Sequence, residues 1–258
     1  MIRRLAFFSA IFGAFLAALV ATPADAADLK VISAGAVRGL IAEIIEDYSR
    51  QTGQKFDFTI GTTGQLRSVI TSGQHADLII VSLPLMGELE KTGKLTEGSR
   101  AELGRVGIGV AVRDGASVPD VATPDAFKKA LVEAKSVAYT NPAEGGTSGI
   151  YFSGLVERLG IADAIKQKAV LTRGGAEAAM AVAEGRAEMA VIYISEGLAL
   201  KGVKVAGLLP PALQDYSAYA AAIPQSSTDA AAARAFIVAL TSPAMAERWR
   251  SNGFEPPK

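Results

Sequence analysis

Short apolar runs alternate with amphipathic segments along the chain from residue 29 onward. The first runs have the length and β-branched composition of buried strands, and the segments after them carry apolar residues at helical spacing. Leu40, Ile41 and Ile44, for example, form one apolar face of a predicted helix. The pattern predicts strands over 30–32, 55–60 and 77–82, each followed by a helix, over 37–50, 64–72 and 85–92. This order is typical of an α/β protein with helices on both faces of a sheet.

A second series of the same kind begins with a predicted strand over 106–112. A later strand over 217–223 is expected to return to the first half, before a helical region over 229–250 interrupted at Pro243. We therefore expect two lobes, each a mixed sheet flanked by helices, joined by two strand crossings with a ligand cleft between them. Between the crossings, helices are predicted over 124–134, 149–159 and 176–184, and strands over 136–139, 169–172 and 190–194. The expected division is 27–106 plus 215–258 for the first lobe and 107–214 for the second.

The first 26 residues have the three parts of an export signal. Arg3 and Arg4 precede an apolar run over 5–20, and Ala24-Asp25-Ala26 fits the small-x-small cleavage pattern. The chain has no cysteine, and its 26 basic residues balance its 26 acidic ones. We therefore expect a protein of the bacterial periplasm, and the charge balance argues against a nucleic-acid or membrane-surface partner.

Four loops rich in Gly, Ser and Thr each join a predicted strand to a predicted helix. A helix that begins in small residues offers free backbone N–H groups, and its dipole favours an anion at that end. Four such loops in one exported chain indicate a binding protein that closes several helix N-termini around a small anion. The loops cover residues 33–36, 61–64, 145–149 and 173–175.

The residue inventory offers little for catalysis. His75 is the single histidine and lies in a polar loop, so we expect it to be exposed and without a role in a site. A zinc site is improbable without cysteine or a second histidine, and the chain lacks the hydrolase elbow, the Walker A loop and the dinucleotide glycine motif. We expect no enzyme, no metal and no cofactor. The enzyme alternative would require an acid such as Glu144 or Glu177, or His75, beside the ligand.

Five segments resemble the periplasmic molybdate-binding proteins of ABC transporters, and they follow one another in the same order over nearly all of the predicted mature chain. The resemblance implies a type II periplasmic binding fold, an anion held by hydroxyl and N–H donors, and delivery by a monomer to an inner-membrane ABC permease. The segments are KVISAGA (30–36), IGTTGQLR (60–67), ADLIIVS (76–82), NP (141–142) and EGRAEMAVIY (184–193).

The same resemblance assigns individual site residues. A hydroxyl is kept at Thr63 and a tyrosine at Tyr193, whereas Ala36 stands where the family has a serine. Two guanidinium groups, Arg38 beside the first loop and Arg173 in the fourth, are better suited to carboxylates or phosphates than to a neutral-donor oxyanion site. The full set of candidate ligand-binding residues is Ala36, Arg38, Thr63, Gly64, Thr147, Ser148, Arg173, Gly175 and Tyr193.

Two ligand classes follow from these residues. By resemblance the ligand is a molybdate or tungstate type of oxyanion, and the alternative is an organic di- or tricarboxylate held by Arg38 and Arg173. Other interpretations stay open for single residues. Arg38 and Arg67 could face solvent, Thr63 and Thr147 could be helix N-caps, and Tyr193 could be a buried core aromatic.

Overall fold

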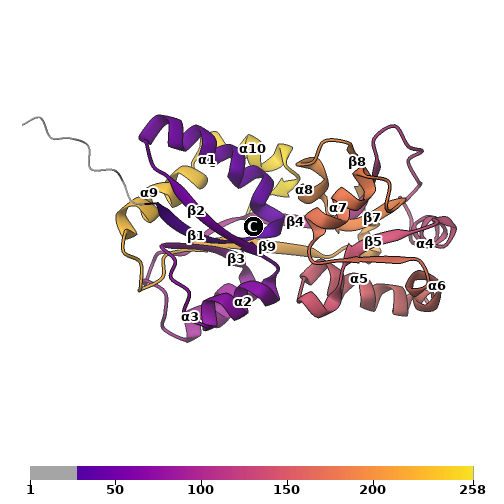
Figure 1. Ribbon diagram of the computed structural model, residues 1–258, viewed down its shortest axis with the longest axis horizontal. Helices are drawn as coiled ribbons and strands as arrows, with labels where there is room; N and C mark the ends of the chain where they lie inside the picture. Colours follow the sequence, from indigo (N-terminus) through magenta and orange to yellow (C-terminus); the bar gives the residue numbers. More distant parts are fainter. Residues whose placement is uncertain (1–27, 258) are drawn as a thin grey trace, which may run out of the picture.

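The computed structural model describes residues 28–257 and has two lobes side by side (Figure 1). The sheet of the first lobe has the order β2-β1-β3-β9-β4, with β1 parallel to β2 and β3 and with β9 antiparallel to β3 and β4. Its strands are β1 (Leu29–Ala34), β2 (Phe56–Gly61), β3 (Leu78–Ser82), β9 (Tyr216–Ala222) and the first half of β4 (Ala101–Arg113). The short β10 (Phe254–Glu255) pairs with β4 at the edge.

The second lobe continues from the same long strand. β4 pairs with β9 as far as Gly107, and from Ile108 it pairs with strands of the second lobe instead. Those strands are β5 (Val137–Thr140), β6 (Ala169–Thr172), β7 (Met189–Tyr193) and β8 (Val203–Leu208). β5 is parallel to β6 and β7, whereas β7 and β8 are antiparallel to β4. The two lobes therefore share one continuous strand.

Helices cover both faces of each sheet, so the expected architecture of two mixed α/β lobes is confirmed (Figure 1). The first lobe carries α1 (Arg38–Thr52), α2 (Thr63–Thr71), α3 (Leu83–Lys91), α9 (Ala230–Leu240) and α10 (Ala246–Ser251). The second carries α4 (Pro124–Glu133), α5 (Thr147–Arg158), α6 (Ala162–Lys166), α7 (Gly175–Ala183) and α8 (Ile194–Leu198). The 3₁₀ turns are η1 (Gly35–Val37), η2 (Pro142–Glu144), η3 (Pro211–Leu213) and η4 (Pro243–Met245).

The small side chains of α7 determine where that helix begins. Ala178, Ala179, Ala181 and Val182 are fully buried and pack against an alanine-rich face made by β4, β5 and β7. Because alanine projects so little, the helix lies close to the sheet. Its first residue, Gly175, is thereby held at the edge of the sheet where the strands β5, β6 and β7 end.

The sequence pattern missed two strands and shortened a third. β8 has six residues, half-buried or exposed, without a regular alternation, and β10 has two, which is too short for any periodicity to show. β4 extends five residues before the strand expected at 106. The division at about residue 107 stays a prediction, supported by the change of partner in β4. The expected signal, 1–26, lies outside the described residues, and within 28–257 no helix is both long and apolar enough to cross a bilayer.

Candidate functional site

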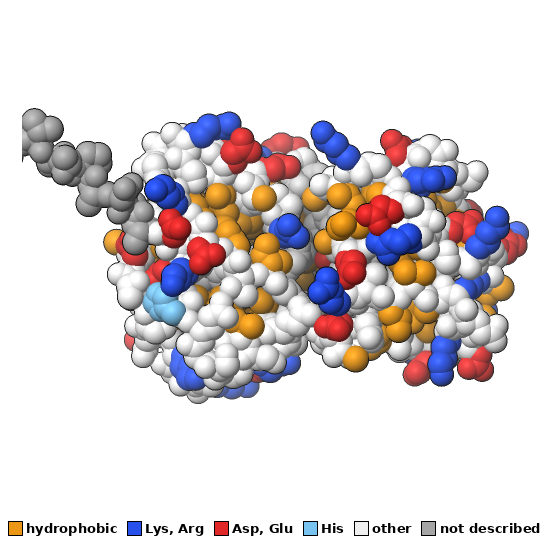
Figure 2. Space-filling model, in the orientation of Figure 1, with side chains coloured by type: hydrophobic (Ala, Val, Ile, Leu, Met, Phe, Trp, Pro, Cys, Tyr) orange, Lys and Arg blue, Asp and Glu red, His pale blue; other side chains and the backbone are white. Residues whose placement is uncertain are grey.

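A cavity of about 330 Å³ lies between the lobes and is lined by residues from all four Gly/Ser/Thr loops. Figure 2 shows the furrow that separates the lobes, with basic side chains on both of its rims. Every candidate site residue except Gly64 is part of the lining. The lining includes Ala36 and Arg38 at the start of α1, Thr62, Thr63 and Gln65 at the start of α2, Thr147 and Ser148 at the start of α5, and Arg173 to Glu177 at the start of α7.

Gly64 has a different part in the structure. Its N–H donates to the carbonyl of Gly145 at 3.0 Å, so that the backbones of the two lobes touch beside the cavity. A Cβ atom on Gly64 would lie 2.8 Å from the Cα of Gly145, closer than any side chain tolerates. Gly64 therefore joins the lobes at the margin of the cavity, and its contact with ligand stays a prediction.

Further hydrogen bonds join the lobes around the cavity. Gln65 donates from Nε2 to Oε2 of Glu144 at 2.8 Å, next to the Gly64 contact. On the α8 side the hydroxyl of Ser195 donates to the carbonyl of Ala36 at 2.7 Å. The cavity is thus bounded by lobe contacts on two sides. Glu144 belongs to one of these contacts and does not line the cavity.

The hydroxyls of Thr63 and Thr147 meet across the cleft. Their Oγ1 atoms are 3.2 Å apart, one from each lobe. Neither residue is a helix N-cap, because α2 is capped by Thr62 in a capping box with Gln65 and α5 begins after Gly146. The N-cap interpretation of both threonines is therefore wrong, and their hydroxyls are available to an anion between the lobes.

Two arginines line the cavity from opposite lobes. Arg38 is exposed and forms no ion pair with any described residue. Arg173 has an 82% exposed side chain, and its Nε lies 3.5 Å from Oε2 of Glu177, whose pKa is lowered chiefly by the backbone N–H of Arg173. Arg67, by contrast, pairs with Glu88 on the surface of the first lobe at 2.9 Å, as its solvent-facing interpretation predicted.

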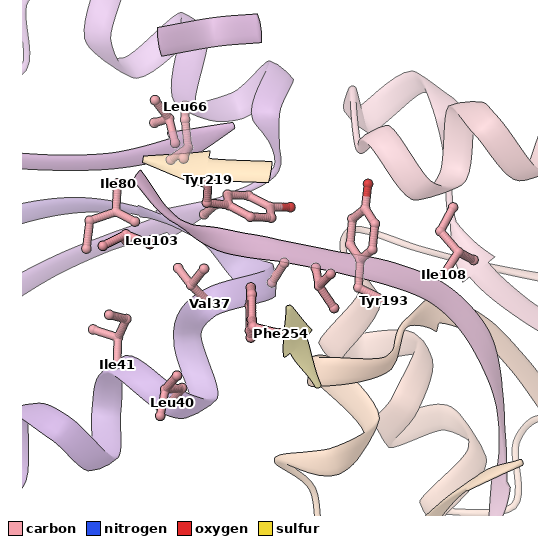
Figure 3. Close-up of a cluster of buried hydrophobic side chains, with 14 of the residues drawn as sticks. Val37, Leu40, Ile41, Leu66, Ile80, Leu103, Ile108, Tyr193, Tyr219 and Phe254 are labelled. Atoms are coloured by element: carbon pink, nitrogen blue, oxygen red, sulfur yellow. The ribbon is translucent and has the colours of Figure 1, made fainter. Parts of the chain in front are cut away.

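Two tyrosines bring neutral hydroxyls to the floor of the cavity. The hydroxyl of Tyr193 lies 2.6 Å from Oγ of Ser217, and burial raises its pKa strongly. Tyr219 is buried as well, its pKa is raised by the same cause, and its hydroxyl is directed toward Tyr193 in the close-up of Figure 3. Both phenols stay protonated near neutral pH, so they act as hydrogen-bond donors without charge.

Glu196, like Tyr219, lines the cavity and was missed by sequence reasoning. It lies in the first turn of α8, and its Oε2 atom is buried without a hydrogen-bond partner among the described residues. Burial raises the pKa of this carboxyl to about 7, although backbone groups of Tyr193, Ala176 and Gly175 partly oppose the shift. The available signal was position: Glu196 lies in the first turn after the buried strand β7, at the sheet edge that carries the cleft loops.

His75 lies away from the cavity, where it is only half-buried rather than fully exposed. Its Nε2 is 3.4 Å from Oδ1 of Asp77, at the opposite end of the first-lobe sheet. Within residues 28–257 no group of three or more His, Cys, Asp or Glu side chains is placed to hold a metal ion.

Comparison with known proteins identifies the family. The model of the bacterial extracellular solute-binding proteins matches residues 29–255. This chain belongs to that family. The match covers both lobes and the strand that joins them.

Individual relatives of this solute-binding protein differ in what their names say they handle. It is 32% identical over 248 residues to an aconitate isomerase of Pseudomonas sp., covering 92% of this chain and 93% of that protein. It is 28% identical to a molybdate-binding protein of Azotobacter vinelandii over 182 residues, 70% of each chain. A solved periplasmic molybdate-binding protein of Azotobacter vinelandii superposes with a TM-score of 0.74 at 18% identity, over 90% of this chain and all of that one. The resemblance noted from the sequence, and the type II fold, are thereby confirmed.

Proposed function

We propose that this solute-binding protein captures a small organic di- or tricarboxylate in the cleft. The observation that carries the proposal is the pair of arginines, Arg38 and Arg173, which line one cavity from opposite lobes. A guanidinium binds a carboxylate through two parallel hydrogen bonds, and two guanidiniums on facing walls suit a ligand with carboxylates at both ends. The hydroxyls of Thr63 and Thr147 and the backbone N–H groups at the starts of α5 and α7 would donate hydrogen bonds to the part of the ligand between its two end carboxylates.

The shape and chemistry of the cavity support a carboxylate more than a molybdate type of oxyanion. Ala36 supplies no hydroxyl where the molybdate-binding relatives are expected to have one. The cavity, about 330 Å³, falls in the range of about 300 to 1,000 Å³ that is usual for small organic ligands. Aconitate, a tricarboxylate with one carbon–carbon double bond, is the first candidate, because the relative covering 92% of the chain carries it in its name.

Two uses of the bound acid have support. The solute-binding family and the predicted export signal favour capture in the periplasm by a monomer, followed by delivery to an inner-membrane ABC permease. A second function, isomerisation of the bound acid, is favoured by Glu196, a proton-exchanging group in the lining. The sequence predicted no enzyme, and the enzyme alternative required Glu144, Glu177 or His75 beside the ligand. Of these Glu177 lines the cavity, and Glu196 lines it as well.

Thermal melting of the mature protein against an anion panel tests the binding proposal. The panel contains cis- and trans-aconitate, citrate, succinate, molybdate, tungstate, sulfate and phosphate. A ligand at a hundred times its Kd adds about 2.7 kcal/mol to the free energy of unfolding, which raises Tm by several degrees. We expect the tricarboxylates to give the largest shift. A shift with molybdate and tungstate alone would overturn the proposal in favour of the oxyanion.

Arginine variants locate the binding energy. Arg38→Ala and Arg173→Ala each remove a charge-assisted contact, which contributes about 1.5 to 3 kcal/mol, so calorimetry should show Kd rising roughly 10- to 150-fold. Arg67→Ala is the matched control, because Arg67 pairs with Glu88 outside the cavity. Equal affinities for all three variants and the unchanged protein would place the carboxylates elsewhere.

A further inference from the structure

Glu196 places an acidic side chain in the wall of a cavity that is proposed to bind an anion. Its carboxyl group lies against Gly175, which has no side chain; a Cβ atom on that residue would be 1.8 Å from Oε2. A Cβ atom on Gly35 would be 3.8 Å from Oε1, the other carboxyl oxygen. Two glycines, one from each lobe, thus leave room for this carboxyl between the starts of α7 and η1. The residue as a whole is only partly covered, since it borders the cavity, whereas its Oε2 atom is buried.

An ionised carboxylate at this place would repel a bound polyanion at close range. Glutamine would have nearly the same shape and would lack the charge, so a protein that only captures anions gains nothing from the acid. No described side chain pairs with Oε2, and the basic groups of the lining, Arg38 and Arg173, form no ion pair with it. A carboxyl whose Oε2 is not engaged by another side chain can gain and lose a proton beside the ligand, and glutamine cannot.

We propose that Glu196 is a catalytic residue that moves a proton between two carbon atoms of a bound unsaturated polycarboxylate, so that the cleft isomerises a ligand of the aconitate type. This inference rests on the proposed binding of a polycarboxylate in the same cavity. It adds a reaction to the capture function, with Glu196 as both base and acid.

The reaction needs no co-reactant. The Glu196 carboxylate takes a proton from the methylene carbon of aconitate, and the electron pair of that C–H bond forms a new double bond to the central carbon. The pair of the old double bond moves to the carbon that was vinylic, and Glu196 returns its proton there, so that this carbon becomes the methylene. Atoms and charge are conserved and Glu196 ends as a carboxylate. The angle at which the site holds the original C–C single bond sets whether the new double bond is cis or trans.

The other lining groups suit the charge that develops during this step. The intermediate spreads its extra negative charge into the carboxylates of the ligand, which Arg38, Arg173 and the N-termini of α5 and α7 can stabilise. Tyr193 and Tyr219 lie near Glu196, on β7 and β9. Because their hydroxyls stay protonated, they act as hydrogen-bond donors and do not compete with Glu196 for the proton of the ligand. A carboxyl with a pKa of about 7 is able both to accept and to return a proton at neutral pH.

Proton NMR in D₂O tests the inference on the mature protein. With cis-aconitate we expect trans-aconitate to appear and deuterium to enter the methylene and vinylic positions. Glu196→Gln should lower both rates by about 10²- to 10⁴-fold, the usual contribution of a general acid–base. Its Kd for tricarballylate, the saturated analogue, should stay within about tenfold of the unchanged protein. Glu157→Gln, on the exposed surface of α5, is the matched control and should change neither quantity.

Each outcome separates the two proposals. If the protein binds no polycarboxylate, the proposed function fails and the inference falls with it. If it binds cis-aconitate but neither isomerises it nor exchanges its protons, or if Glu196→Gln remains active, the inference alone is overturned. Should Glu196→Gln not fold, the rate of the unchanged protein against pH gives a second test. A rate that rises with pH through an inflection near 7, or falls on both sides of it, supports Glu196, and a flat profile contradicts it.

Discussion

Two acidic side chains, Asp77 of the first lobe and Glu196 of the second, lie close to strand ends and have opposite surroundings. Asp77, before β3, is buried and accepts from the backbone N–H groups of Lys30 at 3.0 Å, Thr228 at 2.8 Å and Asp229 at 3.3 Å. Hydroxyls of Ser227 and Thr228 add two further donors. Burial alone would raise its pKa, but these donors outweigh burial and hold the pKa below its usual value. Burial raises the pKa of Glu196 to about 7, because the backbone N–H groups near its carboxyl offset only part of the burial and no side chain pairs with Oε2.

The difference separates an acid that holds the fold from one that is kept for a ligand. Asp77 ties the chain before α9 to the starts of β1 and β3, and both of its carboxyl oxygens accept hydrogen bonds within the protein. Glu196 leaves acceptor capacity unused at the wall of the cavity, which costs folding free energy. An unfavourable group retained at a binding site is what a functional role would explain.

The largest effect on stability is expected at Asp77. Asp77→Ala leaves three backbone N–H groups without an acceptor, and each buried donor costs about 1 to 3 kcal/mol, so the free energy of unfolding should fall by about 4 kcal/mol. Urea denaturation at pH 7 measures it. Asp57→Ala, an exposed acid on β2, serves as the control with little expected change. A loss of ligand affinity in Asp77→Ala protein that keeps its stability would reverse the assignment of the two acids.

A smaller effect, and one that depends on pH, is expected at Glu196. Because its folded pKa of about 7 lies above the unfolded value near 4.5, the native state binds the proton more tightly, and stability falls as pH rises through that window. The loss approaches roughly 3 kcal/mol above pH 7. The pKa values of Tyr193 and Tyr219 are raised and that of Glu177 is lowered, so none of these neighbours titrates in this window.

Denaturation curves at pH 4.5 and pH 8 check this sign. The difference in free energy of unfolding between Glu196→Gln and the unchanged protein should grow in favour of the variant by up to about 3 kcal/mol between the two pH values. The constant offset caused by the amide cancels in this comparison. A difference that does not change with pH would mean that Glu196 titrates normally and that water or another donor reaches Oε2.

The sequence was sufficient for the fold because its signals are local and repeated. Strand and helix periods, and the four Gly/Ser/Thr loops, each depend on a few neighbouring residues, and the sheet edge then gathers the loops around one cavity. Contacts between distant segments were not readable. Gly64 meets Gly145 because of how the lobes approach each other. Glu196 was missed for the same reason, since its burial depends on Gly175 from another helix. The cap of α2 is local, a capping box of Thr62 with Gln65, and was placed one residue late at Thr63.

The smallest effect is expected from Gly175→Ala, which tests whether the carboxyl of Glu196 needs the space that this glycine leaves. The new Cβ would lie 1.8 Å from Oε2, so Glu196 must move or α7 must shift, at a cost of about 1 to 3 kcal/mol in stability. Gly174→Ala is the matched control, because a Cβ there meets nothing within 4 Å and its φ of −170° is extended backbone. We expect that variant to lose no more than a few tenths of a kcal/mol.

A double-mutant cycle gives the decisive form of this measurement. If the clash with Glu196 causes the loss in Gly175→Ala, then adding Glu196→Ala removes the clash, and the double variant should be more stable than the sum of the two single changes predicts by about 1 kcal/mol or more. Additive losses would mean that Gly175 acts only through the backbone at the start of α7. In that case the carboxyl of Glu196 has room to turn toward solvent without the space left by Gly175. The difference from Asp77, which is hydrogen-bonded within the protein, would then come from the solvent exposure of Glu196.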